Sequence, residues 1–268
     1  MKGRVLIVAG SDSGGGAGLQ ADIKTVTALG GYAATAVTAL TAQNTTGVAA
    51  IHEIPAEFVA QQMRVVLEDI GADCLKAGML HRAEVIDTVC DVVEELAPDT
   101  PFVVDPVMVA KGGATLLADT AAETLKRRLI PMTTVLTPNL PEAEALAGHP
   151  AGSVADAADL ARELLSFGAR AVFLTGGHRE GAEIVDVLVD RDGTVETFTN
   201  PRVETRHTHG TGCTIASAIA TGLAQGMPLS DAVGRAHAYT YEAIRTAPGY
   251  GAGHGPINHA HTIRDDQS

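Results

Sequence analysis

Short apolar runs and helical periods alternate along most of the chain. Apolar runs of strand length predict buried strands at residues 5–9, 32–40, 74–77, 102–104, 134–136 and 171–174. Apolar positions at helical spacing predict helices at residues 19–29, 59–70, 86–96, 121–129, 142–147, 155–167, 215–223 and 229–244. This alternation is typical of βαβ units, so we expect an α/β fold whose mostly parallel sheet carries helices on both faces.

Two features complete the predicted architecture. Residues 184–189 and 195–198 are apolar runs separated by Asp192-Gly193, which predicts an antiparallel hairpin at a sheet edge. The segment from residue 249 onward is rich in Gly and His and is expected to be loop. The sequence shows no linker and no repeat, so residues 1–268 are expected to form a single domain.

Charge and composition narrow the class of protein. With 19 basic and 32 acidic residues the net charge is −13, and the longest basic run is 126–128, so no nucleic-acid binding is expected. The three cysteines, Cys74, Cys90 and Cys213, lack the spacing of a zinc site and cannot all pair. Residues 5–9 are too few for a signal-peptide core, and no run approaches the ~18 apolar residues of a membrane span. We therefore expect a reduced, cytoplasmic protein without membrane contact.

In parallel sheets the ligand site lies beyond the carboxyl ends of the strands, which directs attention to the segments after each predicted strand. Residues 10–18 carry five glycines and lead into a predicted helix. A dinucleotide fingerprint fails here because Leu19 stands where the last glycine is required, and no Gly-Lys-Ser/Thr of a Walker loop follows. From this segment alone, a tight strand-to-helix turn is an equally good interpretation.

Residues 208–213 precede the predicted helix 215–223. Free N–H groups at a helix start bind anions, and Gly210 and Gly212 would let them converge on a phosphate or a developing negative charge. A cysteine at this place, Cys213, is expected to have a lowered pKa and could accept a proton as a general base. The alternative is a small apolar residue in the first turn, which is the commoner role of a cysteine.

Several polar residues follow other strands. Asn139 and Glu142 match a capping box, while Glu142 together with Asp105 could also hold Mg²⁺ or its waters. Lys111 lies among glycines and could reach a phosphate, or be a solvated turn. Gln43 suits a planar heterocycle, and Asp22 could accept a hydrogen bond from a ligand, although both could be surface residues.

Taken together, these segments resemble the hydroxymethylpyrimidine/phosphomethylpyrimidine kinases of thiamine biosynthesis, a branch of the ribokinase-like superfamily. The matching segments occur in order along nearly the whole chain, at residues 10–25, 38–44, 76–80, 105–111, 137–144, 176–178 and 209–214. The resemblance implies a ribokinase-like three-layer α/β/α sandwich and a homodimer. It also implies phosphorylation, dependent on ATP and Mg²⁺, of 4-amino-5-hydroxymethyl-2-methylpyrimidine and then of its monophosphate.

The resemblance further implies roles for individual residues. The anion hole and catalytic cysteine correspond to Gly210, Thr211, Gly212 and Cys213. Contacts to the pyrimidine correspond to Gly10, Ala17, Asp22, Gln43 and Met79. The ATP-binding residues correspond to Lys111, Asn139, Thr175 and Gly177, and the metal site corresponds to Glu142 and Asp105. Thr175 stands where many members carry a lysine, which leaves that phosphate contact open.

Three other functions remain to be distinguished. A pyridoxal/pyridoxine kinase acts on a ring that also bears a hydroxymethyl group. A non-catalytic pyrimidine- or thiamine-sensing protein could share the scaffold, because fold alone does not establish function. A dinucleotide-dependent oxidoreductase is disfavoured by the glycine spacing after the first strand.

Overall fold

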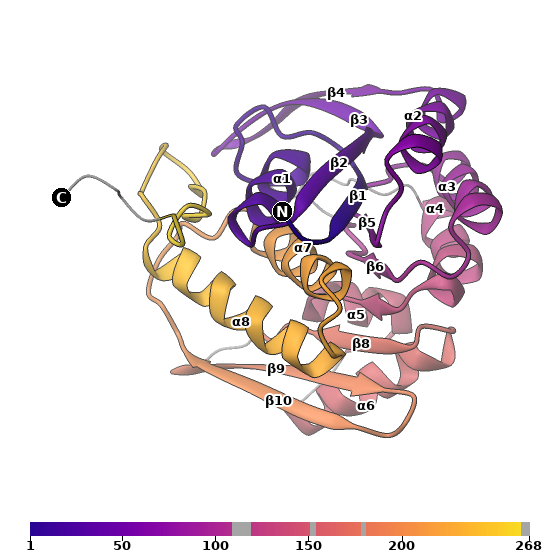
Figure 1. Cartoon of the computed structure of the whole chain (residues 1–268). Helices are drawn as coiled ribbons and strands as arrows, with labels where there is room; N and C mark the ends of the chain where they lie inside the picture. The colour runs from indigo at the N-terminus through magenta and orange to yellow at the C-terminus, as the bar shows by residue number, and fades with distance from the viewer. Residues whose placement is uncertain (109–118, 151–153, 178–180, 264–268) are drawn as a thin grey trace.

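The computed structural model describes residues 1–108, 119–150, 154–177 and 181–263. Its main sheet has eight strands in the order β10-β9-β8-β7-β6-β5-β1-β2 (Figure 1). The strands are β1 (Arg4–Ala9), β2 (Tyr32–Val37), β5 (Cys74–Ala77), β6 (Phe102–Val104), β7 (Val135–Leu136), β8 (Ala171–Leu174), β9 (Glu183–Asp190) and β10 (Val195–Pro201). Neighbours from β2 to β8 pair in parallel, and β9 and β10 form the antiparallel edge, which confirms the predicted mostly parallel sheet and its hairpin.

Helices cover both faces of this sheet, which makes three layers. One face carries α1 (Gly18–Ala28), α7 (Thr211–Ala224) and α8 (Leu229–Arg245), and the other carries α2 (Ala56–Asp69), α3 (Ala83–Leu96), α4 (Asp119–Thr124), α5 (Leu140–Ala147) and α6 (Val154–Ser166). Successive residues of β1 alternate between the two cores: Val5 and Ile7 pack under α1 and α7, while Leu6 and Val8 pack against α2 and α3. The fold is the predicted α/β/α sandwich, because both faces of each central strand are buried.

The predicted strand 32–40 is wrong in one respect. The chain leaves the main sheet at Thr38, whose hydroxyl donates to the carbonyl of Met79 at 2.7 Å. Beyond it, β3 (Ala39–Asn44) pairs antiparallel with β4 (Gly47–Glu53) in a separate two-stranded sheet. The strand β4 was not predicted: residues 48–51 are an apolar run, but every position of the strand is partly or fully exposed. This small sheet brings Thr41 and Gln43 to the carboxyl end of the main sheet.

The segment after α4 also differs from a regular helix. A π-helical turn, Leu125–Leu129, and a 3₁₀ turn, Ile130–Met132, continue it to the start of β7. Among the residues that the structure describes, no helix combines the length and the apolar character that crossing a membrane requires.

Candidate active site

A cavity of about 890 Å³ opens at the carboxyl ends of the parallel strands. Most residues that the sequence analysis selected line it, although they come from seven separate segments. These are Gly10, Ala17, Gln43, Met79, Asp105, Asn139, Glu142, Thr175, Gly177, Gly210, Thr211, Gly212 and Cys213. Lys111 lies outside the described residues. Asp22 does not line the cavity.

The start of α7 forms one wall. Gly210 caps the helix with φ +89°, and a Cβ built on it would lie 1.8 Å from the carbonyl oxygen of Gly16. The glycine segment before α1 and the one before α7 are therefore in direct backbone contact, which only glycine at position 210 permits. The Thr211 hydroxyl donates to the carbonyl of Thr208 at 2.8 Å. The first turn of α7 lines the cavity, so its free N–H groups are available to bind an anion there.

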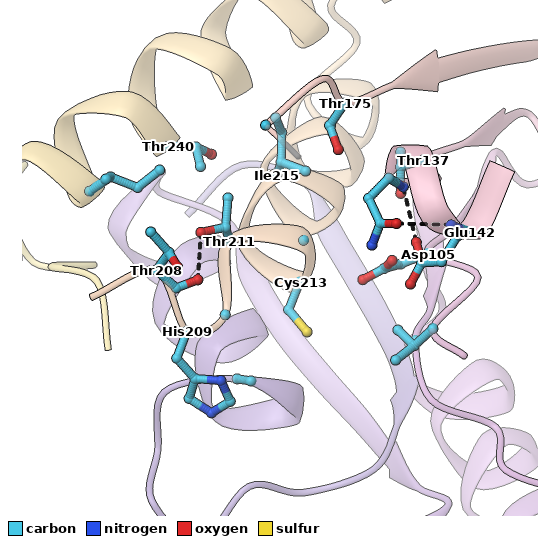
Figure 2. A pocket seen from close by; sticks show the side chains of 18 of the residues that line it. Asp105, Thr137, Glu142, Thr175, Thr208, His209, Thr211, Cys213, Ile215 and Thr240 are labelled. Carbon is cyan, nitrogen blue, oxygen red and sulfur yellow. Dashed lines mark hydrogen bonds between the residues drawn. The ribbon is translucent and has the colours of Figure 1, made fainter. Parts of the chain in front are cut away.

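Cys213 lies in the first turn of α7, between His209 on one side and Asp105 and Glu142 on the other (Figure 2). The predicted lowering of its pKa is wrong. Burial raises the pKa of the thiol to about 12, the carboxylates of Asp22 and Asp105 act in the same direction, and Lys76 opposes them. The helix N-terminus does not outweigh burial here, so the thiol is protonated at neutral pH.

Asp22 corrects a second expectation. Its side chain is fully buried in α1, and both carboxylate oxygens accept from Nζ of Lys76 at 2.9 Å. The Ser217 hydroxyl donates to the same carboxylate at 2.7 Å. Asp22 is thus held by protein groups away from the cavity surface, and direct contact with a substrate is not available to it. The sequence analysis assigned no role to Lys76, although a lysine within an apolar strand is a signal of a buried charge.

Asp105, which directly follows β6, and Glu142, in the first turn of α5, form an acidic pair. Burial raises the pKa of Asp105 to about 6, and burial together with the charge of Asp105 raises the pKa of Glu142 to about 8. The predicted capping box is confirmed: Glu142 accepts from the backbone N–H of Asn139, and the Asn139 side chain accepts from that of Glu142, both at 3.0 Å. The cap fixes the carboxylate at the cavity, so the structural interpretation is confirmed, and it leaves the carboxylate placed where the functional interpretation requires it.

These two carboxylates fit Mg²⁺. Oδ2 of Asp105 is buried without a hydrogen-bond partner in the structure, and a cation would satisfy it. Within the described ranges no group of three or more His, Cys, Asp or Glu side chains gathers as a metal site. Two carboxylates, completed by water and substrate phosphates, suit Mg²⁺, which rarely takes an all-protein cage.

The raised pKa values predict a pH-dependent stability. Between pH ~4 and pH 8 the folded chain keeps protons on Asp105 and Glu142 that the unfolded chain releases, so stability falls as pH rises through this range. We expect the thermal midpoint of the metal-free protein to fall between pH 5 and pH 9, and the fall to be smaller by at least about 3 °C in Glu142→Gln, which keeps the capping acceptor.

Glu57→Gln, at an exposed acid in the first turn of α2, is the matched control and should follow the wild type. Equal slopes for Glu142→Gln and the wild type would show that Glu142 carries no proton across this range. Differential scanning fluorimetry with and without Mg²⁺ makes the measurement, and Mg²⁺ should flatten the wild-type slope.

The opposite side of the cavity is organised by Asp12, which the sequence analysis did not select. Its carboxylate accepts from the backbone N–H groups of Gly14, Gly16 and Ala17 at 2.8–2.9 Å and contacts Nε2 of His209 at 2.9 Å. Burial alone would raise the pKa of Asp12, but the bonds from His209 and the backbone hold it below its usual value. An Asp two residues before the consecutive glycines 14–16 was the available signal.

Gln43 and Met79 complete this side. Nε2 of Gln43 lies 3.1 Å from Nε2 of His209, so His209 connects the predicted heterocycle contact to the Asp12 loop. A Cβ on Gly10 would lie 3.0 Å from the methyl group of Met79, so the first strand ends against that side chain. The arrangement offers an amide group and an apolar surface, which suits a flat, polar-edged ring.

The remaining wall comes from the ends of β7, β8 and β9. Asn139 pairs with Thr175 as an isolated bridge, and the backbone N–H of Gly176 donates to Asp186 at 2.7 Å. Burial raises the pKa of Asp186 to about 6. A Cβ on Gly176 would lie 2.1 Å from the carbonyl oxygen of Val185, so the turn into Gly177 requires glycine there. Thr175 faces the cavity (Figure 2).

Comparison with known proteins agrees with this geometry. The family described as phosphomethylpyrimidine kinase matches residues 12–258. A thiamine biosynthesis bifunctional protein, ThiED, of Geobacter sulfurreducens is 51% identical over 267 residues; these are 98% of this chain and 54% of that protein, so the chain spans about half of its length. A hydroxymethylpyrimidine/phosphomethylpyrimidine kinase of Bacillus subtilis is 44% identical over 257 residues. This alignment covers 96% of this chain and 94% of that kinase.

A solved structure extends the likeness. Pyridoxal kinase of Staphylococcus aureus in complex with AMP-PCP and pyridoxal is 32% identical with a TM-score of 0.88, over 97% of this chain and 94% of that one. The family match covers most of the chain, and relatives above 40% identity align over nearly all of it. The chain belongs to the phosphomethylpyrimidine kinase family.

Proposed function

We propose that the chain transfers the γ-phosphoryl group of ATP to the hydroxymethyl oxygen of 4-amino-5-hydroxymethyl-2-methylpyrimidine, and in a second turnover to the resulting monophosphate. The observation that carries this proposal is the convergence of three parts in one cavity. A heterocycle side with Gln43 and Met79 faces the glycine start of α7, and the acidic pair Asp105 and Glu142 lies beside that helix. The names of the related kinases support the same substrates.

Phosphoryl transfer requires positioning and charge neutralisation more than covalent chemistry. The N–H groups that follow Gly210 hold the transferring phosphoryl group. The hydroxymethyl oxygen attacks the γ-phosphorus, the bond to the β,γ-bridging oxygen breaks, and ADP leaves. Cys213 accepts the hydroxymethyl proton in the first transfer, and it does so as the thiolate, which is the minor form of this thiol at neutral pH. In the second transfer the acceptor is already a phosphate and needs no strong base.

Asp105 and Glu142 would hold Mg²⁺, which when bound offsets the phosphate charge. Asn139, Thr175 and Gly177 line the nucleotide side, and Lys111 is proposed as a further phosphate contact. We also propose that residues 1–268 form one kinase domain, since both cores pack on one sheet.

Two further parts of the proposal concern the whole molecule. A reduced, cytoplasmic setting suits the three free cysteines. We also propose a homodimer, which the resemblance to the kinase family implies.

A time course with ATP, Mg²⁺ and hydroxymethylpyrimidine, read by mass spectrometry, tests the function. Monophosphate followed by diphosphate is expected. Pyridoxal is tested in parallel, because the structural likeness to a pyridoxal kinase favours it as the second candidate. A kcat/KM higher for pyridoxal than for the pyrimidine would reverse the assignment, and binding of the pyrimidine without turnover would favour a sensing protein.

Gln43→Ala should raise the KM for the pyrimidine about 5- to 150-fold and change the KM for ATP little. Losing a hydrogen bond between uncharged groups, with its partner left buried and unpaired, costs ~1–3 kcal/mol, which corresponds to this factor. Steady-state kinetics with each substrate varied in turn make the measurement. Gln61→Ala, at an exposed amide of α2, is the control. An unchanged pyrimidine KM in Gln43→Ala would remove Gln43 from the binding site.

A further inference from the structure

A fully buried ion pair lies beneath the catalytic end of α7, and the mechanism above does not use it. Lys76 of β5 and Asp22 of α1 are both 0% exposed, and Nζ lies 2.9 Å from each carboxylate oxygen. An apolar pair of similar volume is often as stable as a buried ion pair, because removing two charges from water is costly. Stability is therefore a weak reason for charges at this place.

The pair is tied to Cys213 through two helices. Ser217, which donates to Asp22, follows Cys213 by four residues in α7, so the two side chains lie on one face of that helix. Gly18 precedes Asp22 by four residues in α1, and its backbone N–H interacts with the Cys213 thiol. The two helices thus run side by side, with Cys213 opposite Gly18 and Ser217 opposite Asp22.

Lys76 lies at the cavity wall with Cys213 and Asp105. A Cβ on Gly78 would lie 2.9 Å from Nζ of Lys76, so the glycine after β5 leaves room for the ammonium group. The ammonium group has three hydrogens. Among the described residues its hydrogen bonds go to Asp22 alone.

The charges that act on the thiol come from three elements. Asp22 of α1 and the carboxylate of Asp105, at the end of β6, both raise the pKa of Cys213, and Lys76 of β5 lowers it. Although burial favours the neutral amine, the negative groups around Lys76 raise its pKa above the usual value, so the ammonium stays charged. Without Lys76, two buried carboxylates would act on the thiol unopposed.

We propose that Lys76 is a positioning residue for the first phosphoryl transfer: its buried ammonium group, held by Asp22, is a fixed positive charge at the cavity wall that also carries Cys213, where it stabilises negative charge on the sulfur. The pair with Asp22 fixes the position of this charge, and Ser217 ties it to the helix that carries the thiol. The inference rests on the proposed function for the use of the thiolate, but the thiolate itself is measurable without substrate.

The test is the rate at which iodoacetamide alkylates Cys213 at pH 9 in the substrate-free protein, read by peptide mass spectrometry, which separates Cys213 from the buried Cys74 and Cys90. We expect Lys76→Met to slow alkylation about three- to tenfold and Asp22→Asn to accelerate it by a similar factor. These factors allow for the lower nucleophilicity of a less basic thiolate. A purely structural role would move both rates in the same direction.

Lys2→Met makes the same change at an exposed position and should leave the rate unchanged. The double variant Asp22→Asn/Lys76→Met should return close to the wild-type rate, because both charges are absent. Equal rates in all variants, or the same direction of change in both single variants, would overturn the proposal. If Lys76→Met does not fold, Asp22→Asn decides, since only a faster rate agrees with the proposal.

A second readout separates this inference from the proposed function. Lys76→Met should slow formation of the monophosphate more than formation of the diphosphate. One possible result is that the two single variants shift the alkylation rate in opposite directions while Lys76→Met slows both transfers equally. That result would support the effect of Lys76 on the thiol but contradict the role of Cys213 as the base. If Lys76→Met leaves the alkylation rate unchanged but slows only the first transfer, Cys213 remains the proposed base and the role of Lys76 is overturned.

Discussion

Replacing Cys213 with alanine is expected to slow the first phosphoryl transfer about 10²- to 10⁴-fold and to leave the second within about tenfold of the wild type. The lower and upper factors are those of a positioned general base. The variant removes only the thiol: the backbone N–H groups of α7 remain, and so do Gly210 and the acidic pair. Because the monophosphate offers an ionised oxygen as the acceptor, its transfer does not depend on a base at this position.

Single-turnover experiments started from each acceptor measure the two transfers separately. Cys90→Ala, at a buried cysteine of α3 in the opposite core, is the matched control and should change the rate of neither transfer. Equal losses of both transfers in Cys213→Ala would point to damage in the anion-binding segment and would contradict the base role.

Replacing Gly210 with alanine is expected to lower both transfers together, about 10²- to 10³-fold. A Cβ there would lie 1.8 Å from the carbonyl oxygen of Gly16, and neither backbone can yield without moving the other glycine segment. The displaced N–H groups no longer fit the transferring phosphoryl group, and losing one such donor costs about this factor. The KM for the pyrimidine should also rise, because Gly16 belongs to the loop that Asp12 organises.

Gly226→Ala separates this close contact from the cost of the backbone conformation. Gly226 has φ +81°, close to the +89° of Gly210, but no atom lies within 4 Å of its Cβ position. It should lose about 1 kcal/mol of stability and keep both transfers. Measurements of the thermal midpoint and of each transfer distinguish the two variants. Activity near the wild type in Gly210→Ala would show that the contact between the two glycine segments is dispensable.

Local pattern predicts the central sheet well for a physical reason. A parallel strand buried on both faces is apolar at every position, as residues 5–9 are, and a helix on that sheet repeats its apolar residues at helical spacing. The strand β4 pairs only with β3 and is largely exposed, so its short apolar run at residues 48–51 does not mark a buried strand. The break at Thr38 depends on a hydrogen bond to Met79, which a local pattern cannot contain.

The site residues likewise separate into those that the sequence pattern predicts and those whose environment only the structure shows. The capping box of Asn139 and Glu142 is made by residues three positions apart, so the sequence alone was sufficient to predict it. The glycine requirement at position 210 was visible as a pattern, but its cause, the backbone of Gly16, was not.

The sequence by itself determined the order of the elements, the segments at the strand ends and the residue types that bring chemistry to them. The tertiary structure alone decided which charges those residues meet. Asp22 binds Lys76 from another strand and not a ligand, and the thiol of Cys213 has a raised pKa in place of the expected lowered one. The reason is that burial and Coulomb interactions depend on distance in space, and the groups responsible come from α1, β5 and β6, remote along the chain.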